Sequence, residues 1–145
     1  MKSLLILLGI FTFLISCNNR RVDFSDVYFK ADACFGECPM FEMIIFKNGK
    51  ATYNALLYNQ KYGKFNTELK KINLDSLKLL LDNANVFQRE AKYSTTSTDH
   101  PTYTLRIRSD DGHIKTIVDY GPSGPKKLKT LYNYLFSLRD SQDWK

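Results

Sequence analysis

The sequence contains few of the residues on which catalysis and metal binding usually depend. It has three cysteines, two histidines and one tryptophan in 145 residues. His100 and His113 are isolated from each other and from the cysteines, so the clustered ligands of a zinc site are lacking. There is no Gly-x-Ser-x-Gly nucleophile elbow, no recognisable pair of acid/base carboxylates and no phosphate-binding glycine loop. We therefore expect a protein without catalytic residues, metal or cofactor.

Clusters of basic residues, which would indicate nucleic-acid binding, are also absent. The chain has 21 Lys and Arg against 15 Asp and Glu, and the basic residues are scattered. Removal of residues 1–16 as a signal peptide takes away Lys2 and leaves a net charge of about +5. This balance fits a position near anionic lipid headgroups or phosphates, but a solvated surface without a partner is the favoured interpretation. We expect no nucleic-acid partner.

The longest apolar run lies at the start of the chain. Lys2 precedes the run from Leu4 to Ile15, and the polar segment Asn18-Asn19-Arg20-Arg21 follows it. A membrane-spanning helix needs about 20 apolar residues, so this run is too short to span a bilayer. Its length and its basic start are typical of a secretory signal peptide, which we assign to residues 1–16.

The end of this run resembles a bacterial lipobox, Leu14-Ile15-Ser16-Cys17. The resemblance implies that Cys17 carries acyl chains that hold the protein on a membrane. Asn18 in the next position resembles the signal for sorting to the outer membrane. The expected location is therefore the cell envelope of a Gram-negative bacterium, on the periplasmic or the surface face. In the alternative, cleavage near Ser16 leaves Cys17 as a free thiol.

Two hairpin-and-helix units follow a short tether at residues 17–25. We expect a single domain over residues 26–140, with strands near 26–30, 40–46, 50–58, 62–69, 103–109 and 114–120, and helices near 74–85 and 125–138. The predicted fold class is α+β. Two hairpins with one or two extra strands form an antiparallel sheet, and both helices pack on one face of it. Residues 92–101 are expected to form a loop, and residues 140–145 to fray.

The turns of both hairpins carry a strong signal. Asn48-Gly49 and Asp111-Gly112 each predict a two-residue type I′ turn. The first turn would pair Ile44 with Tyr53 and Phe46 with Ala51. In the second hairpin, alternation places Asp119 on the wet face, with Ile114, Val118 and Tyr120 on the buried face. Asn73 is the expected N-cap of the first helix.

The most specific motif of the predicted domain is a turn that contains Cys34, Gly36, Cys38 and Pro39. Gly36 lets the chain fold back to the Cα separation of about 5.5–6 Å that a disulfide requires. We expect a structural disulfide between Cys34 and Cys38. The alternatives are a redox pair, although such pairs usually have two intervening residues at a helix N-terminus, half of a zinc site, or free thiols.

Four further residues are candidates for binding. Phe35 is either an exposed recognition residue or a plug in the core beneath the ring. Glu37 either binds a cation or a basic partner, or is a solvated turn residue. Asp99-His100 lies beside several hydroxyl groups and suggests chemistry, but the favoured interpretation is an Asp-His-Pro turn that leads into a strand.

The motif Cys34-x-Gly36-x-Cys38-Pro39, followed by Phe41, Asn48-Gly49 and Tyr53, resembles a family of bacterial lipoprotein domains of unknown function. Thr98-Asp99-His100-Pro101 matches a later loop of that family, and the resemblance covers residues 26–138. It implies no activity.

Two classes of function follow. The first is a non-catalytic, lipid-anchored binding or structural module that contacts an envelope protein or another envelope component. The second is a thiol-disulfide redox or metal-dependent protein that uses Cys34 and Cys38. The two hairpin-and-helix halves add a third hypothesis, an inhibitor-like module that binds another protein.

Overall fold

Seven strands form one sheet in the order β4-β3-β2-β1-β6-β7-β5. The computed structural model describes residues 22–145, so the expected signal peptide and the lipidation residue Cys17 lie outside the described residues. The strands are β1 (Phe24–Ala31), β2 (Phe41–Phe46), β3 (Lys50–Ala55), β4 (Gly63–Glu68), β5 (Lys92–Tyr93), β6 (Thr102–Ser109) and β7 (Ile114–Tyr120). The helices are α1 (Lys71–Ala84), the short 3-10 helix η1 (Val86–Gln88) and α2 (Lys126–Ser141).

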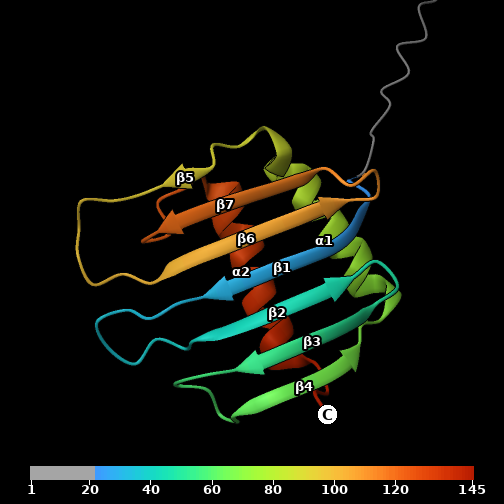
Figure 1. Cartoon of the computed structure of the whole chain (residues 1–145), viewed down its shortest axis with the longest axis horizontal. Coiled ribbons are helices and arrows are strands. Elements are labelled where there is room, and N and C mark those ends of the chain that lie inside the picture. The colour runs from blue at the N-terminus through green and yellow to red at the C-terminus, as the bar shows by residue number, and fades with distance from the viewer. Residues whose placement is uncertain (1–21) are drawn as a thin grey trace, which may run out of the picture.

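Both α-helices lie on the same face of the sheet (Figure 1). The α+β fold class is thus confirmed. The sheet is mixed rather than wholly antiparallel, because β5 pairs in parallel with β7. This two-residue strand lies within the segment expected to be a loop. Val118 fixes it by donating a hydrogen bond of 2.9 Å to the carbonyl oxygen of Ala91.

The core is centred on β1, which has a neighbour on each side. Its alternate residues Val27, Phe29 and Ala31 are buried against the helices. The Phe29 ring lies 5.6–5.8 Å from four other aromatic rings, those of Phe41, Tyr103, Tyr132 and Phe136. Aromatic contacts at this spacing add to the free energy gained by burial, so they make this the best-packed part of the domain.

The apolar stripes expected on the two helices are present. Leu77, Leu81 and Ala84 of α1 are buried, as are Leu128, Leu131, Tyr132, Leu135 and Leu138 of α2. The expected N-cap is wrong, because α1 begins at Lys71 after Lys70. Asn73 instead donates a hydrogen bond of 3.2 Å to Gln142, and its carbonyl oxygen accepts one of 2.8 Å from Tyr134. Contact with the second helix therefore takes precedence over local capping.

The first hairpin turn is one residue longer than the sequence predicted. Gly49 has a φ of +90°, but Asn48 does not have the positive φ that a type I′ turn needs. The Gly49 N–H donates a hydrogen bond of 2.9 Å to the carbonyl oxygen of Phe46, which describes a type I turn followed by a left-handed glycine. The extra residue moves the register, so that Tyr53 pairs with Met43 and not with Ile44.

This shift changes which side chains share a face, because side chains alternate along a strand. Met43 and Ile45 are buried, together with their partners Tyr53 and Ala51. The hairpin therefore has one buried face, although the expected register placed apolar residues on both.

The second hairpin has the same kind of turn, because Gly112 has a φ of +86° and donates a hydrogen bond of 3.0 Å to Ser109. Leu105 therefore pairs with Ile117, and both are buried. The expected facing of β7 is wrong. Asp119 points into the core, and Ile114 is exposed.

Candidate functional site

Three loops lie at the same end of the sheet, opposite the end at which β1 begins (Figure 1). They are the cysteine turn between β1 and β2, the loop between β3 and β4, and the threonine-rich segment before β6. The first and third lie close together because Ala31 pairs with Tyr103, and Asp32 donates a hydrogen bond of 2.9 Å to Thr102. The antiparallel order thus gathers segments that are far apart in the sequence.

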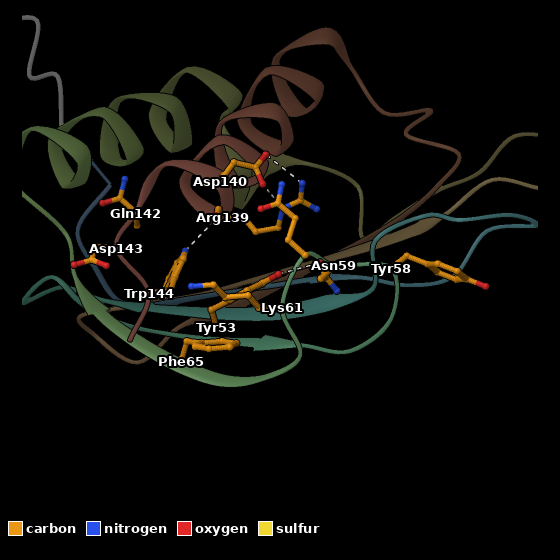
Figure 2. A pocket seen from close by; sticks show the side chains of 11 residues that line it. Tyr53, Tyr58, Asn59, Lys61, Phe65, Arg139, Asp140, Gln142, Asp143 and Trp144 are labelled. Atoms are coloured by element: carbon orange, nitrogen blue, oxygen red, sulfur yellow. Dashed lines mark hydrogen bonds and ion pairs between the residues drawn. The ribbon is translucent and has the colours of Figure 1, made fainter.

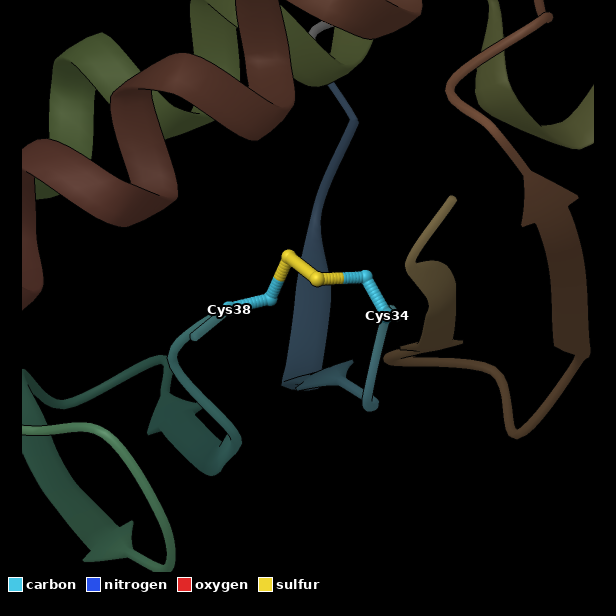
Figure 3. The surroundings of a disulfide bond; sticks show 2 residues. All are labelled: Cys34 and Cys38. Atoms are coloured by element: carbon cyan, nitrogen blue, oxygen red, sulfur yellow. A yellow bond between two sulfur atoms is a disulfide. The ribbon is translucent and has the colours of Figure 1, made fainter. Parts of the chain in front are cut away.

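The cysteine turn is closed by a disulfide between Cys34 and Cys38, as predicted (Figure 3). The two Cα atoms are 5.6 Å apart. Gly36 has a φ of +154°, which side chains rarely permit, and the space around it is open, so conformation alone requires glycine here. The turn connects two strands rather than preceding a helix, so it lacks the helix N-terminus at which redox-active cysteine pairs usually lie.

Large apolar side chains are exposed on the two loops beside the disulfide. Phe35 is 87% exposed, which excludes the core-plug interpretation, and Glu37 is exposed beside it. Leu57, Tyr58 and Tyr62 of the β3–β4 loop are 52%, 50% and 64% exposed. We call Phe35, Leu57, Tyr58 and Tyr62 the apolar loop surface. A shallow hollow runs between the loops, lined by Ala33, Cys34, Phe35, Gly36, Glu37, Met40, Leu57 and Tyr58.

The β3–β4 loop is held in place by Asn59. Its amide donates hydrogen bonds of 2.7 Å to the carbonyl oxygen of Met40 and 2.8 Å to that of Leu57. Its side-chain oxygen accepts a hydrogen bond of 2.9 Å from the Tyr53 hydroxyl. Met40 and Leu57 are also joined directly by a main-chain hydrogen bond of 2.8 Å. The loop is therefore fixed to β2, β3 and the end of the cysteine turn.

A cleft of about 270 Å³ lies on the other side of this loop (Figure 2). Aromatic rings form one wall of it. Tyr53 lies 6.1 Å from the stacked ring of Phe65 and 5.2 Å from Trp144. The polar wall comes from the loop and the C-terminal segment and consists of Asn59, Gln60, Lys61, Arg139, Asp140, Gln142 and Asp143. Rings on one side and hydrogen-bonding groups on the other can hold an organic ligand without reacting with it.

Arg139 is the most buried charged residue of the cleft lining. Its Nε and Nη2 atoms donate hydrogen bonds of 2.7 Å and 3.1 Å to the carboxylate of Asp140. The guanidinium lies over the rings of Phe41 and Phe136, at 5.4 Å and 5.2 Å from their centroids. Its buried Nη1 has no hydrogen-bond partner among the described residues. Arg139 thus joins the cleft to the aromatic core.

The structure does not bring Asp99 and His100 into this cleft. They lie before β6, whereas the cleft lies beside β3 and β4, with β1 and β2 between them. Asp99 has a φ of +69° and accepts a hydrogen bond of 3.2 Å from Thr98, and the His100 ring is 6.2 Å from that of Tyr120. These are contacts of a turn, and none of them activates a hydroxyl nucleophile.

Comparison with protein families identifies the chain over almost the whole of this fold. The pattern of a domain of unknown function, DUF6438, matches residues 25–139. The chain belongs to the DUF6438 family. The matched range includes the cysteine turn, both hairpins and most of α2, and it ends before Trp144. No curated protein matches the sequence.

The DUF6438 domain contains a buried charged residue that sequence reasoning missed. Asp119 is fully buried and accepts hydrogen bonds of 2.7 Å from the Ser123 N–H and 3.2 Å from its hydroxyl. A further hydrogen bond of 3.1 Å comes from the Gly124 N–H. A Cβ atom on Gly124 would lie 2.7 Å from the Asp119 carboxylate, so glycine is required there. Asp119 therefore fixes the loop that leads into α2.

The cleft was also missed, because its rings come from three separate parts of the chain. The only available signal was the sole tryptophan, placed in a segment that was expected to fray. Within residues 22–145 no group of three or more His, Cys, Asp or Glu side chains could hold a metal ion. In the same residues no helix is long and apolar enough to cross a membrane.

Proposed function

We propose that this DUF6438 protein is a lipid-anchored domain of the bacterial cell envelope that binds an envelope protein or another envelope component without catalysing a reaction. The observation that carries the proposal is the apolar loop surface. Its members are solvent-exposed although they sit on two loops with fixed conformations. Contiguous exposed apolar residues on a soluble domain usually mark an interaction site.

The position of this surface fits an anchor at Cys17. The strand β1 runs from Phe24 to Ala31 and places the cysteine turn about 23 Å from the start of the strand, at roughly 3.3 Å per residue. Five residues from Cys17 to Val22 span at most about 18 Å when extended. An acylated Cys17 would keep the Val22 end near the membrane and present the apolar loop surface away from it.

The loops are also organised before any partner arrives. The disulfide closes one loop, and Asn59 holds the other through three hydrogen bonds. A fixed loop loses less conformational entropy on binding than a mobile one, so a surface of this kind binds more tightly for the same contacts. This supports a binding role for the disulfide rather than a chemical one.

The anchor is tested by expressing the full chain and the Cys17→Ser variant with a labelled fatty acid. We expect the label and membrane fractionation with the natural sequence, and the loss of both in the variant. An unlabelled full chain that is released in soluble form would contradict the anchor. The result leaves the binding surface untouched, so the two parts of the proposal are tested separately.

Binding is tested in intact cells with a photo-crosslinking residue at position 37, an exposed position of the cysteine turn that no variant below changes. The comparison is between the natural chain, a Phe35→Ser/Tyr58→Ser variant and a control Ile72→Ser/Leu79→Ser variant, whose changes lie on the exposed side of α1. We expect one defined adduct with the natural chain and the control, and its loss with the loop variant. Equal adducts in all three would contradict a role for the apolar loop surface.

A further inference from the structure

The end of the chain occupies the outer edge of the sheet. β4 is the last strand in the sheet order. Lys145 donates a main-chain hydrogen bond of 3.0 Å to Asn66 and accepts one of 2.7 Å from it. This reciprocal pair is the arrangement of two residues in neighbouring antiparallel strands. Lys145 therefore pairs with the β4 edge as one residue of an antiparallel neighbour would, although residues 143–145 form no strand of their own.

The residue before it is anchored in the cleft. The Trp144 side chain is 9% exposed and its ring lies 5.2 Å from that of Tyr53. Its Nε1–H donates a hydrogen bond of 2.9 Å to the carbonyl oxygen of Arg139. A strand paired by its main chain and held by a buried aromatic side chain is how many domains bind extended peptides.

We propose that the β4 edge and the cleft form a groove for an extended peptide with an aromatic anchor, and that residues 143–145 occupy this groove in the free protein. The proposal goes beyond the lipid anchor and the apolar loop surface and depends on neither of them. Its occupant is a peptide because the edge offers main-chain donors and acceptors, which a peptide backbone matches in spacing.

The pairing of Lys145 with Asn66 shows where a bound peptide would gain contacts that residues 143–145 do not make. The main-chain groups of Asn66 point away from β3, and those of Lys64 and Glu68 share this direction because it alternates along a strand. Within residues 22–145, the main chain of Lys145 pairs with Asn66 alone. A strand that continues two residues past the Lys145 position reaches Lys64.

Besides Trp144, the cleft is lined by Phe65 and Lys61 and by Asp140 and Asp143 (Figure 2). The wall of the cleft therefore carries positive and negative side chains, and the main-chain donors and acceptors of the β4 edge lie beside it. This arrangement fits a peptide whose side chains alternate between the cleft and solvent. The tethered tail competes with such a peptide at an effective concentration in the millimolar range. A partner must therefore make the additional contacts at Lys64 to displace it.

The experiment uses a chain that ends at Gln142 and a fluorescein-labelled peptide, Ser-Gln-Asp-Trp-Lys-Thr-Val. The first five peptide residues repeat residues 141–145, and the last two reach Lys64. We expect the shortened chain to bind this peptide at least tenfold more tightly than the intact chain does, measured by fluorescence anisotropy. It should also prefer the peptide at least tenfold over a version with alanine in place of tryptophan. Absence of binding, or equal binding to both chains or both peptides, would overturn the proposal.

Two further measurements test the proposal in case the chain that ends at Gln142 folds poorly. In the intact protein, a displaceable tail opens without global unfolding, so the Asn66 amide should exchange with solvent at least 100-fold faster than that of Phe29. Equal protection of the two amides would show a permanent structural contact and would overturn the proposal. Lys64→Pro removes a main-chain N–H donor at the β4 edge, whereas the hydrogen bonds between β4 and β3 stay intact. The substitution should weaken binding of the labelled peptide about tenfold.

Discussion

The Tyr53 hydroxyl donates a hydrogen bond of 2.9 Å to the side-chain oxygen of Asn59, and this bond connects the cleft to the loop that carries the apolar loop surface. Tyr53 is nearly buried on β3, whereas Asn59 lies in the turn between β3 and β4. The two proposed binding surfaces therefore share one support. A substitution that removes the hydrogen bond between Tyr53 and Asn59 should therefore affect both the cleft and the apolar loop surface.

We predict that Asn59→Ala lowers the free energy of unfolding by about 1–3 kcal/mol. The substitution removes the donors to Met40 and Leu57 and leaves the Tyr53 hydroxyl without its acceptor. Urea unfolding measures the change. The control is Asn54→Ala on the open face of β3, which should stay within about 0.5 kcal/mol. Equal effects of the two substitutions would contradict the bracing role of Asn59.

The Cys34→Ser/Cys38→Ser variant should remain folded but lose about 2 kcal/mol of stability, which is the chain-entropy value for so small a ring. Reduction of the natural protein should produce the same loss. A structural disulfide should have a reduction potential below about −300 mV, as measured against glutathione. A higher potential would instead favour the thiol-disulfide redox hypothesis.

We predict that Asp119→Ala lowers the free energy of unfolding by about 3 kcal/mol or more, because it leaves the buried donors of Ser123 and Gly124 without an acceptor. Ser123→Ala removes only the hydroxyl contact and should lose about 1 kcal/mol. Thermal and urea unfolding compare the two. A smaller loss in Asp119→Ala than in Ser123→Ala would contradict the role assigned to this carboxylate.

Stability should fall at alkaline pH. Burial, followed by the nearby charge of Asp119, raises the pKa of Tyr132 well above its ordinary value. An unfolded tyrosine ionises near pH 10 and the folded one does not, so stability is fully present below about pH 10 and declines as the pH rises above it. Tyr132→Phe should therefore flatten the decline measured by urea unfolding between pH 8 and 11.

The same substitution gives a second result at neutral pH. The buried Tyr132 hydroxyl lies close to the Asp119 carboxylate but makes no hydrogen bond of regular geometry among the described residues, so Tyr132→Phe should change the free energy of unfolding by less than about 1 kcal/mol at pH 7. The control is Tyr62→Phe at an exposed position, which should change neither value. A loss of more than about 1 kcal/mol at pH 7 would indicate a bond to this hydroxyl that the structure does not contain.

The sequence predicted the elements better than their pairing. Helix periodicity identified the buried leucines of α1 and α2, because a helix needs only its own apolar stripe to be recognised. Asn48-Gly49 and Asp111-Gly112 located both hairpins but gave the wrong loop length. One residue more in each loop changed which side chains share a face. As a result Asp119 was assigned to solvent.

The site was predicted only where it is local in the chain. Cys34 and Cys38 are four positions apart, so spacing alone indicated a disulfide. The sequence around Phe35 does not decide whether its side chain is exposed or buried, because its neighbours in space come from the β3–β4 loop. Trp144 contacts Tyr53, and Lys145 pairs with Asn66 of β4, each across more than 70 residues, and no periodicity connects them.

By itself, the sequence determined an α+β domain with two hairpins, two amphipathic helices and a disulfide-closed turn, because each of these depends on residues close together in the chain. The tertiary structure decided the facing of β7, the burial of Asp119 and the position of the C-terminal segment on β4. These features depend on strand register and on long-range packing, which take their free energy from contacts between distant segments.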